Sequence, residues 1–179
     1  MKVLLPMHNS SAKVLLSFFI LIYSSVVAAD SFESSYRLAR SPLIKSSDIK
    51  LLLNHPSVDV REALAQNRKL KPAALIKLAA DSSERVRIAV ATNLSTDTRT
   101  FLVLATDPNH SVKSVVARFE YVPVEALIVL AQDKSAEIRL EVARNLNTTA
   151  ATLKTLLKDS DPDVQAIAAH SLQRIENEE

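Results

Sequence analysis

Apolar and polar positions recur along this chain with a fixed period of 26 residues. The stretch ERVRIAVATN, residues 84–93, is matched by HSVKSVVARF from His110, AEIRLEVARN from Ala136 and PDVQAIAAHS from Pro162, and VDVREALAQN from Val58 precedes them. No copy contains an insertion, so the register produces one β-branched column: Val60, Val86, Val112, Ile138 and Val164. A period of this length predicts stacked repeats that bury their apolar faces against their neighbours.

Within each copy the spacing of apolar residues predicts two short helices. In the first helix they recur at intervals of three and four, as in Val86, Ala89 and Val90, which is typical of one buried helical face. The second helix, as in VEALIVLAQ, carries two columns of large side chains: Leu75, Phe101, Leu127 and Leu153, then Leu78, Leu104, Leu130 and Leu156. Helices this short depend on stacking for stability. We therefore expect an all-α helical-repeat solenoid of about five two-helix repeats.

The repeats begin at residues 55, 81, 107, 133 and 159, so residues 55–179 form the predicted solenoid. Upstream, Ile49, Leu52 and Leu53 continue the apolar pattern, whereas SSYRLARSPL departs from it. We interpret residues 30–54 as a degenerate N-terminal capping repeat.

Three further columns concern helix ends and helix packing. Ser57, Ser83, Asn109, Ser135 and Asp161 precede the first helix, and we expect each side chain to accept a hydrogen bond from its first turn. Asn67, Asn93 and Asn145 follow that helix, where we expect the left-handed conformation that commonly ends helices. An all-alanine column predicts close helix approach: Ala65, Ala91, Ala117, Ala143 and Ala169.

The 179-residue chain contains no glycine and no cysteine. Without glycine, the phosphate-binding and dinucleotide-binding loops and the GxSxG nucleophile elbow are excluded. Without cysteine, disulfides, thiolate nucleophiles and cysteine-held metals are excluded. The histidines show no metal-ligand spacing such as HExxH. We therefore expect no metal site, no cofactor and no enzymatic activity.

The amino end resembles an export signal. Lys2 and Lys13 precede the apolar run VLLSFFILIY, and Val27 and Ala29 fit a signal-peptidase site before Asp30. The run is about half of the ~20 residues that a spanning helix needs. We predict a cleaved signal peptide over residues 1–29; an uncleaved membrane anchor is the alternative, and Met7 is an alternative start.

Removing residues 1–29 takes away Lys2 and Lys13 and no acidic residue, which leaves 20 basic and 20 acidic residues. A nucleic-acid-binding protein is expected to keep a basic excess, so the zero net charge disfavours that class. Export without cysteine favours a periplasmic or secreted location in which disulfides are not needed.

One family matches the repeat motif. The sequence DSSERVRIAVATN followed by FLVLA resembles the variant leucine-rich repeat, a HEAT-like helical repeat, and the resemblance covers about residues 55–171. It implies a right-handed superhelix of alternating helices, one of them short and sometimes 3₁₀, and a role in protein interaction.

Two charged columns accompany the repeat. Cations stand in the first turn of the first helix at Arg61, Arg87, Lys113 and Arg139, and acids recur at Asp81, Asp107, Asp133 and Asp159. Because a cation near a helix N-terminus opposes the macrodipole, it needs a compensating partner, which favours an Asp/Arg ladder between repeats. The alternative is a basic strip that faces a ligand.

Positions at which the copies disagree are the candidates for recognition. The connector RFEY puts Phe119 where asparagine is expected, with Arg118 and Tyr121 beside it, and aromatics and arginine are enriched at interface hot spots. The alternative is that Phe119 fills a gap between repeats. In the second helix the column Lys77, Val103, Val129, Thr155 turns apolar only in the two middle repeats. This indicates either deeper burial of the central helices or an exposed patch, and we expect burial.

These patterns predict an exported, non-enzymatic scaffold or adaptor that binds another protein or peptide of the cell envelope. Its expected contacts are Arg118, Phe119, Tyr121, Val103 and Val129, without nucleic acid and without membrane insertion after signal cleavage. An enzyme or enzyme-associated subunit acting on envelope polymers is the first alternative. A HEAT-like nucleic-acid binder is the second and is disfavoured.

Overall fold

A computed structural model describes residues 31–178, so the predicted signal peptide lies outside the described residues. Residues 31–40 are helical. The helices that follow are α2 (Ser46–Leu52), α3 (Val58–Ala65), α4 (Pro72–Leu78), α5 (Glu84–Ala91), α6 (Thr98–Ala105), α7 (His110–Arg118), α8 (Val124–Leu130), α9 (Ala136–Arg144), α10 (Ala150–Leu156) and α11 (Pro162–Glu178). Residues 31–178 contain no strand, and the fold is an all-α solenoid.

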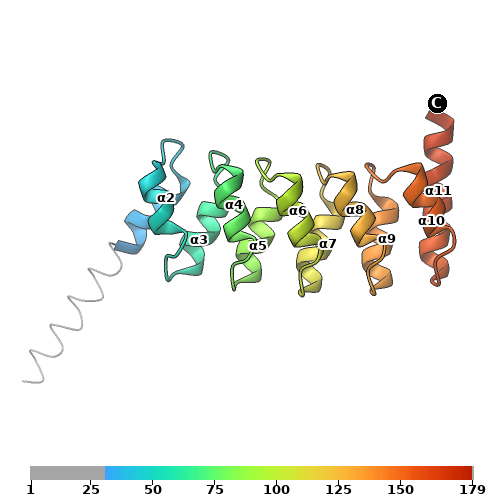
Figure 1. The fold of residues 1–179 in the computed structure, drawn as a ribbon, viewed down its shortest axis with the longest axis horizontal. Coiled ribbons are helices and arrows are strands. Elements are labelled where there is room, and N and C mark those ends of the chain that lie inside the picture. Colours follow the sequence, from blue (N-terminus) through green and yellow to red (C-terminus); the bar gives the residue numbers. More distant parts are fainter. Residues whose placement is uncertain (1–30, 179) are drawn as a thin grey trace, which may run out of the picture.

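The repeats follow one another along one axis from α2 to α11 (Figure 1). Odd-numbered helices pack against the next odd-numbered helix, from α3 to α11, and α6 packs against both α4 and α8. Each odd-numbered helix also packs against the even-numbered helix that follows it, and the last repeat closes with α10 against α11. All of these elements are α-helices, so neither helix of the repeat is 3₁₀.

The predicted core columns lie between these helices. The β-branched column Val60, Val86, Val112, Ile138 and Val164 is completely buried, and both large-residue columns of the even-numbered helices are buried. One continuous hydrophobic core therefore runs through the array and is extended by every repeat, as expected for a solenoid.

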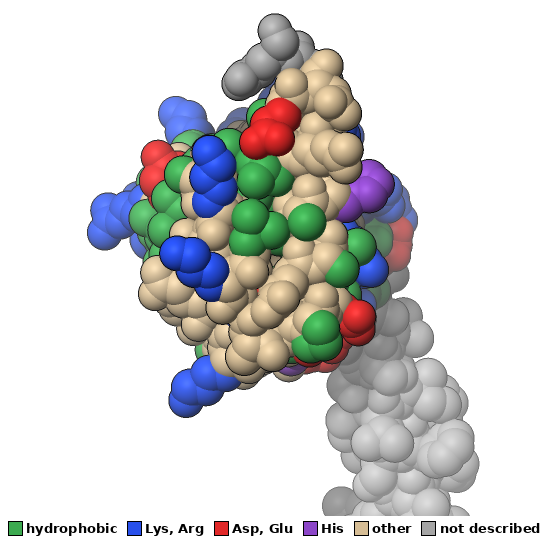
Figure 2. Space-filling view, turned by 90° about the vertical axis from the view of Figure 1, so that its right-hand side faces the viewer, with side chains coloured by type: hydrophobic (Ala, Val, Ile, Leu, Met, Phe, Trp, Pro, Cys, Tyr) green, Lys and Arg blue, Asp and Glu red, His purple; other side chains and the backbone are tan. Residues whose placement is uncertain are grey.

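The alanine column is buried at four of its five positions, Ala65, Ala91, Ala117 and Ala143, where the next odd-numbered helix packs. Ala169 is exposed, so its predicted packing role is wrong. The reason is its position on α11, which no further repeat of the described chain covers. Figure 2 looks onto this end of the array, where hydrophobic side chains gather near the centre of the face.

The asparagine column ends the odd-numbered helices, but the predicted left-handed conformation is wrong. No described residue has a positive φ, and Asn145 has φ −67° and ψ 132°. Instead the buried side chain of Asn93 bridges two repeats. Its Nδ2 donates to the Ala65 and Asn67 carbonyls at 2.6 and 3.1 Å, while its Oδ1 accepts from the Ser95 amide at 2.8 Å.

The same three-way bridge recurs at Asn145, which donates to Ala117 and Phe119, and at Asn67. The Asn67 amide donates to the carbonyls of Ala39 and Ser41 at 2.7 and 2.9 Å. Residues 31–40 thus occupy the place that α3 takes in the next repeat, and the helical segment before α3 joins the array by the same contact.

The residues of the predicted N-cap column precede the odd-numbered helices as expected, but only two of them accept hydrogen bonds from the first turn with their side chains. The side chain of Asn109 accepts from the Ser111 and Val112 amides, and that of Asp161 accepts from the Asp163 and Val164 amides, as predicted. The three serines, Ser57, Ser83 and Ser135, stand at the N-cap without a side-chain cap bond, so the prediction is wrong for them. At these positions an acceptor two residues earlier binds the serine amide: His55 Nδ1, Asp81 Oδ1 and Asp133 Oδ1.

Candidate functional site

The two charged columns form an ion-pair ladder. Arg87 on α5 binds Asp107, which precedes α7, through Nε to Oδ2 at 2.6 Å and Nη2 to Oδ1 at 3.0 Å. Its Nη1 donates to the Asp81 carbonyl at 2.8 Å. The equivalent pairs are Arg61–Asp81, Lys113–Asp133 and Arg139–Asp159. These side chains are largely buried, which leaves the cations too enclosed to act as a basic strip for a ligand.

The ladder shifts the pKa values of its members. The hydrogen bond from Arg139 outweighs burial and lowers the pKa of Asp159, and the same bond raises the pKa of Arg139. At Asp81 and Asp133 burial opposes ionisation, but hydrogen bonds from the cation and from a serine amide leave the pKa below its ordinary value. These carboxylates are therefore ionised structural groups.

The cation column ends at Gln165, which lies in the equivalent place on α11. Its Nε2 donates to the Asp159 carbonyl at 2.6 Å, as the arginines donate to the carbonyl six residues before them. The last helix thus keeps the bond within its own repeat by means of an uncharged side chain.

The connector after α7 contains the aromatic residues predicted for partner binding. Phe119 is half-buried and stacks on the buried ring of Phe101 of the preceding repeat, with centroids 5.9 Å apart. Tyr121 meets Phe119 edge to face at 5.7 Å and is 63% exposed, and Arg118 is exposed. A hydrogen bond with Glu120 raises the pKa of Tyr121. Phe119 therefore joins two repeats and supports Tyr121, whose ring faces solvent.

The apolar positions of the central even-numbered helices are not deeply buried, which corrects our expectation. Val103 on α6 is 43% exposed and Ile128 on α8 is 46% exposed, while Leu102 and Val129 are half-buried. The cause is that α6 and α8 turn only one face toward the odd-numbered helices, and no further layer among the described residues covers the other. The four residues Leu102, Val103, Ile128 and Val129 form what we call the central apolar patch.

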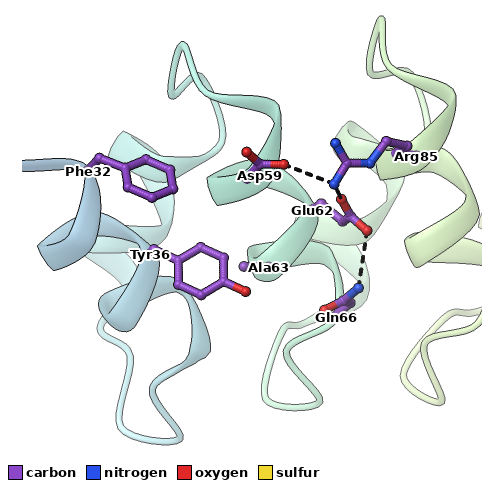
Figure 3. Close-up of a pocket in the computed structure, with 7 residues that line it drawn as sticks. All are labelled: Phe32, Tyr36, Asp59, Glu62, Ala63, Gln66 and Arg85. Atoms are coloured by element: carbon purple, nitrogen blue, oxygen red, sulfur yellow. Dashed lines mark hydrogen bonds and ion pairs between the residues drawn. The ribbon is translucent and has the colours of Figure 1, made fainter. Parts of the chain in front are cut away.

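A pocket near the amino end was not anticipated from the sequence. It is a cavity of about 320 Å³ lined by Phe32, Tyr36, Asp59, Glu62, Ala63, Gln66 and Arg85 (Figure 3). The rings of Phe32 and Tyr36 stack with centroids 5.9 Å apart and come from the helix of residues 31–40. The acidic residues come from α3 and Arg85 from α5.

The polar side of the pocket is held by one guanidinium. Arg85 Nη2 contacts Asp59 Oδ1 at 2.9 Å and also contacts Glu62, and Gln66 donates to Glu62 Oε1 at 3.4 Å. The hydrogen bond with Asp59 and the charge of Glu62 raise the pKa of Arg85. One sequence signal existed, because Glu62 and Arg85 stand at repeat positions where the other copies carry different residues, whereas Asp59 recurs as Asp163.

Within residues 31–178 no group of three or more histidine or acidic side chains could hold a metal ion. No helix in that range is both long and apolar enough to pass through a bilayer.

Comparison with known proteins identifies no relative: the chain matches no protein-family model and no curated protein.

Proposed function

We propose that this protein is an exported, non-enzymatic scaffold that binds another protein or peptide of the cell envelope through the central apolar patch and Tyr121. The observation that carries the proposal is the exposure of Val103, Ile128 and Tyr121 on adjoining repeats of a continuous array. Buried columns repeat because packing requires it. In contrast, Tyr121 differs from its counterparts in both flanking repeats, Val103 is preceded by Lys77, and Ile128 is followed by Lys154.

The chemistry of this surface fits protein recognition. Tyr121 offers a large ring with few rotatable bonds, the half-buried Phe119 beneath it limits its movement, and Arg118 adds an exposed guanidinium beside them. The patch on α6 and α8 supplies aliphatic contact area, which is a common mark of interaction sites when it is exposed. An extended or helical segment with apolar side chains is the partner that such a surface would take.

The resemblance to the variant leucine-rich repeat supports the same proposal. We propose that residues 55–171 form an array of that kind, whose implied role is protein interaction. The all-helical stacking of α3 to α11 is compatible with it.

A capture experiment tests the proposed surface. The full-length chain, tagged at its carboxyl end, would be recovered from envelope extract beside two variants, Tyr121→Ala and Val103→Ser/Ile128→Ser. Leu51→Ser is the matched control, because Leu51 is 74% exposed and occupies on α2 the position that Val103 occupies on α6. We expect a protein captured by the parent and the control and lost from both surface variants.

Two other capture results would contradict the proposal. Equal capture by all four chains would place the contact elsewhere and contradict the proposed surface. If none captures a protein, while the parent is retained on isolated envelope polymers, the alternative of an enzyme-associated subunit acting on those polymers would replace the scaffold.

The proposed export rests on residues 1–29 and has its own test. Fractionation of cells that express the tagged chain, followed by amino-terminal sequencing, should give a periplasmic or secreted protein that begins at Asp30. A membrane-bound product of full length would show that the segment is an uncleaved anchor, and a cytoplasmic product would contradict export.

A further inference from the structure

The amino-terminal pocket has two walls whose chemistry favours the same kind of ligand. One wall consists of the stacked rings of Phe32 and Tyr36, and the other carries the carboxylates of Asp59 and Glu62 (Figure 3). The face of an aromatic ring attracts cations through its quadrupole, and a carboxylate attracts them through its charge. Organic cations interact favourably with both walls at once.

The charge balance of the pocket points the same way. Asp59 and Glu62 share a single cation, Arg85, so the lining residues carry a net charge of −1. The side chains of Asp59 and Arg85 are 52% and 57% exposed, so solvent reaches the pair and a ligand could compete for it. Arg85 thus acts as an internal competitor for the carboxylates.

The size of the cavity limits the ligand. At about 320 Å³ it lies at the small end of the range of about 300–1,000 Å³ typical of ligand pockets. A lysine or arginine side chain or a small quaternary ammonium ion is small enough to enter it.

Repeat symmetry shows that packing does not require this arrangement. The positions of Asp59 and Glu62 are held by Arg85 and Ile88 in the next repeat, by Ser111 and Ser114 in the third, and by Glu137 and Leu140 in the fourth. The acidic pair thus occurs once among these repeats, and it lies where the aromatic pair of the preceding helix faces it.

A second cation lies near the aromatic wall but belongs to a different cavity. Arg40 stands 5.7 Å from the centroid of the Tyr36 ring and lines an adjoining basic cavity together with Arg68 and Lys69. It is not among the residues that line the acidic pocket. Its position shows that the Tyr36 ring already accommodates a guanidinium of this chain.

We propose that the pocket formed by Phe32, Tyr36, Asp59, Glu62 and Arg85 binds an organic cation of the alkylammonium or guanidinium class. The cation lies against the two rings and shares the carboxylates with Arg85. Two sources could supply this group: a basic side chain of a peptide, or a free small amine. This site is separate from the central apolar patch and does not depend on the proposed scaffold function.

The test is a titration of the isotopically labelled full-length chain, followed by amide chemical shifts at constant ionic strength. The probes are methylguanidinium chloride, tetramethylammonium chloride and the blocked peptide acetyl-Ala-Arg-Ala-amide, with sodium chloride as the reference. We expect saturable shifts confined to residues 32–36, 59–66 and 85. Saturation by the peptide at lower concentration than by the free cations assigns a peptide source, and the reverse order assigns a small amine.

Two variants separate binding from folding. Tyr36→Leu keeps an apolar side chain but removes the ring face, and should weaken cation binding by roughly two- to fivefold. Tyr121→Leu is the matched control and should leave binding unchanged, because Tyr121 lies outside the pocket. Melting curves establish that each variant is folded.

The sharpest variant is Arg85→Gln. It releases both carboxylates and changes the net charge of the lining from −1 to −2, so affinity for the probes should rise by roughly threefold. Arg99→Gln, at an exposed arginine on α6, is the control and should have no effect on these shifts. Unchanged or weaker binding in Arg85→Gln, or parent shifts spread equally over exposed carboxylates such as Glu125, would overturn the proposal.

Discussion

Two adjacent repeats, residues 81–106 and 107–132, have equivalent helices and contribute to the same core, but different side chains join them to their neighbours. The first uses Arg87, which makes two bonds to Asp107 and two to backbone carbonyls, and Asn93, which bridges to the preceding repeat. The second uses Lys113, which contacts Asp133 through one atom, and Phe119, which stacks on Phe101.

The difference follows from side-chain chemistry. The guanidinium is planar and offers several donors in a fixed geometry, whereas an ammonium group is a compact charge on a flexible stem. A phenyl ring cannot hydrogen-bond to carbonyls as the Asn93 amide does, and contributes stacking in its place. The repeat with the simpler ion pair and the aromatic contact exposes Tyr121 and Ile128, and the candidate recognition surface extends from it to Val103 in the repeat joined by Arg87 and Asn93.

The largest expected effect distinguishes the two ion pairs. Arg87→Ala leaves the largely buried Asp107 without its cation, and breaking such a pair costs about 3–5 kcal/mol in unfolding free energy. Lys113→Ala should cost clearly less, because Lys113 makes a single bond and its pair is more exposed. Urea unfolding followed by circular dichroism measures the unfolding free energy of both variants. Equal losses of stability would mean that guanidinium geometry contributes nothing to the contact between successive repeats.

The next effect concerns the bridging amide. Asn93→Ala removes the donor for the Ala65 and Asn67 carbonyls and should cost about 2–3 kcal/mol, since buried polar groups lose their partner. Asn54→Ala, at an exposed asparagine, serves as the control and should change stability little. A loss below about 0.5 kcal/mol at Asn93 would show that water replaces the bridge.

A smaller effect is expected from the alanine column. Ala117→Leu forces extra volume into the contact with the next odd-numbered helix and should cost about 1–3 kcal/mol, which lowers the thermal midpoint by several degrees. Ala169→Leu adds the same volume at the exposed end of the same column and should leave the midpoint nearly unchanged. Similar midpoints in the two variants would contradict tight packing at Ala117.

The smallest effect per residue is expected from protonation of the ladder carboxylates, which lowers the stability of the fold at low pH. The folded pKa values of Asp81, Asp133 and Asp159 are depressed, so the stability that they contribute is present above the unfolded pKa of about 3.9 and is lost as pH falls through the folded values. Thermal midpoints should therefore stay level from pH 7 to 5 and fall below pH 4. A variant with Asp159→Asn should show a shallower fall than the parent.

Much of this architecture could be predicted because each packing position of a repeated sequence occurs several times, once in every copy. Valine at positions 60, 86 and 112 is informative as a column in a way that a single valine is not. The charged columns indicated a ladder, and the pairs lie 20 residues apart between successive repeats. The aromatic connector at Phe119 was found by its departure from that regularity.

The predictions that were wrong or missing have a common physical cause: the same type of residue can make different contacts in different surroundings. Asparagine can adopt the left-handed conformation, but its amide also fits between two carbonyls of the preceding repeat, and here that contact occurs. The pocket at Tyr36 was missed because residues 31–40 have lost the repeat motif while keeping its place in the array.

The sequence by itself determined the period, the helical class, the core columns and the partners of the ladder, because each of these depends on spacing along the chain. Only the tertiary structure decided which surfaces stay open. The exposure of Val103, the exposure of Ala169 on the last helix and the meeting of Tyr36 with Asp59 depend on what lies beside each helix. That neighbourhood is created when repeats stack, and no single repeat specifies it.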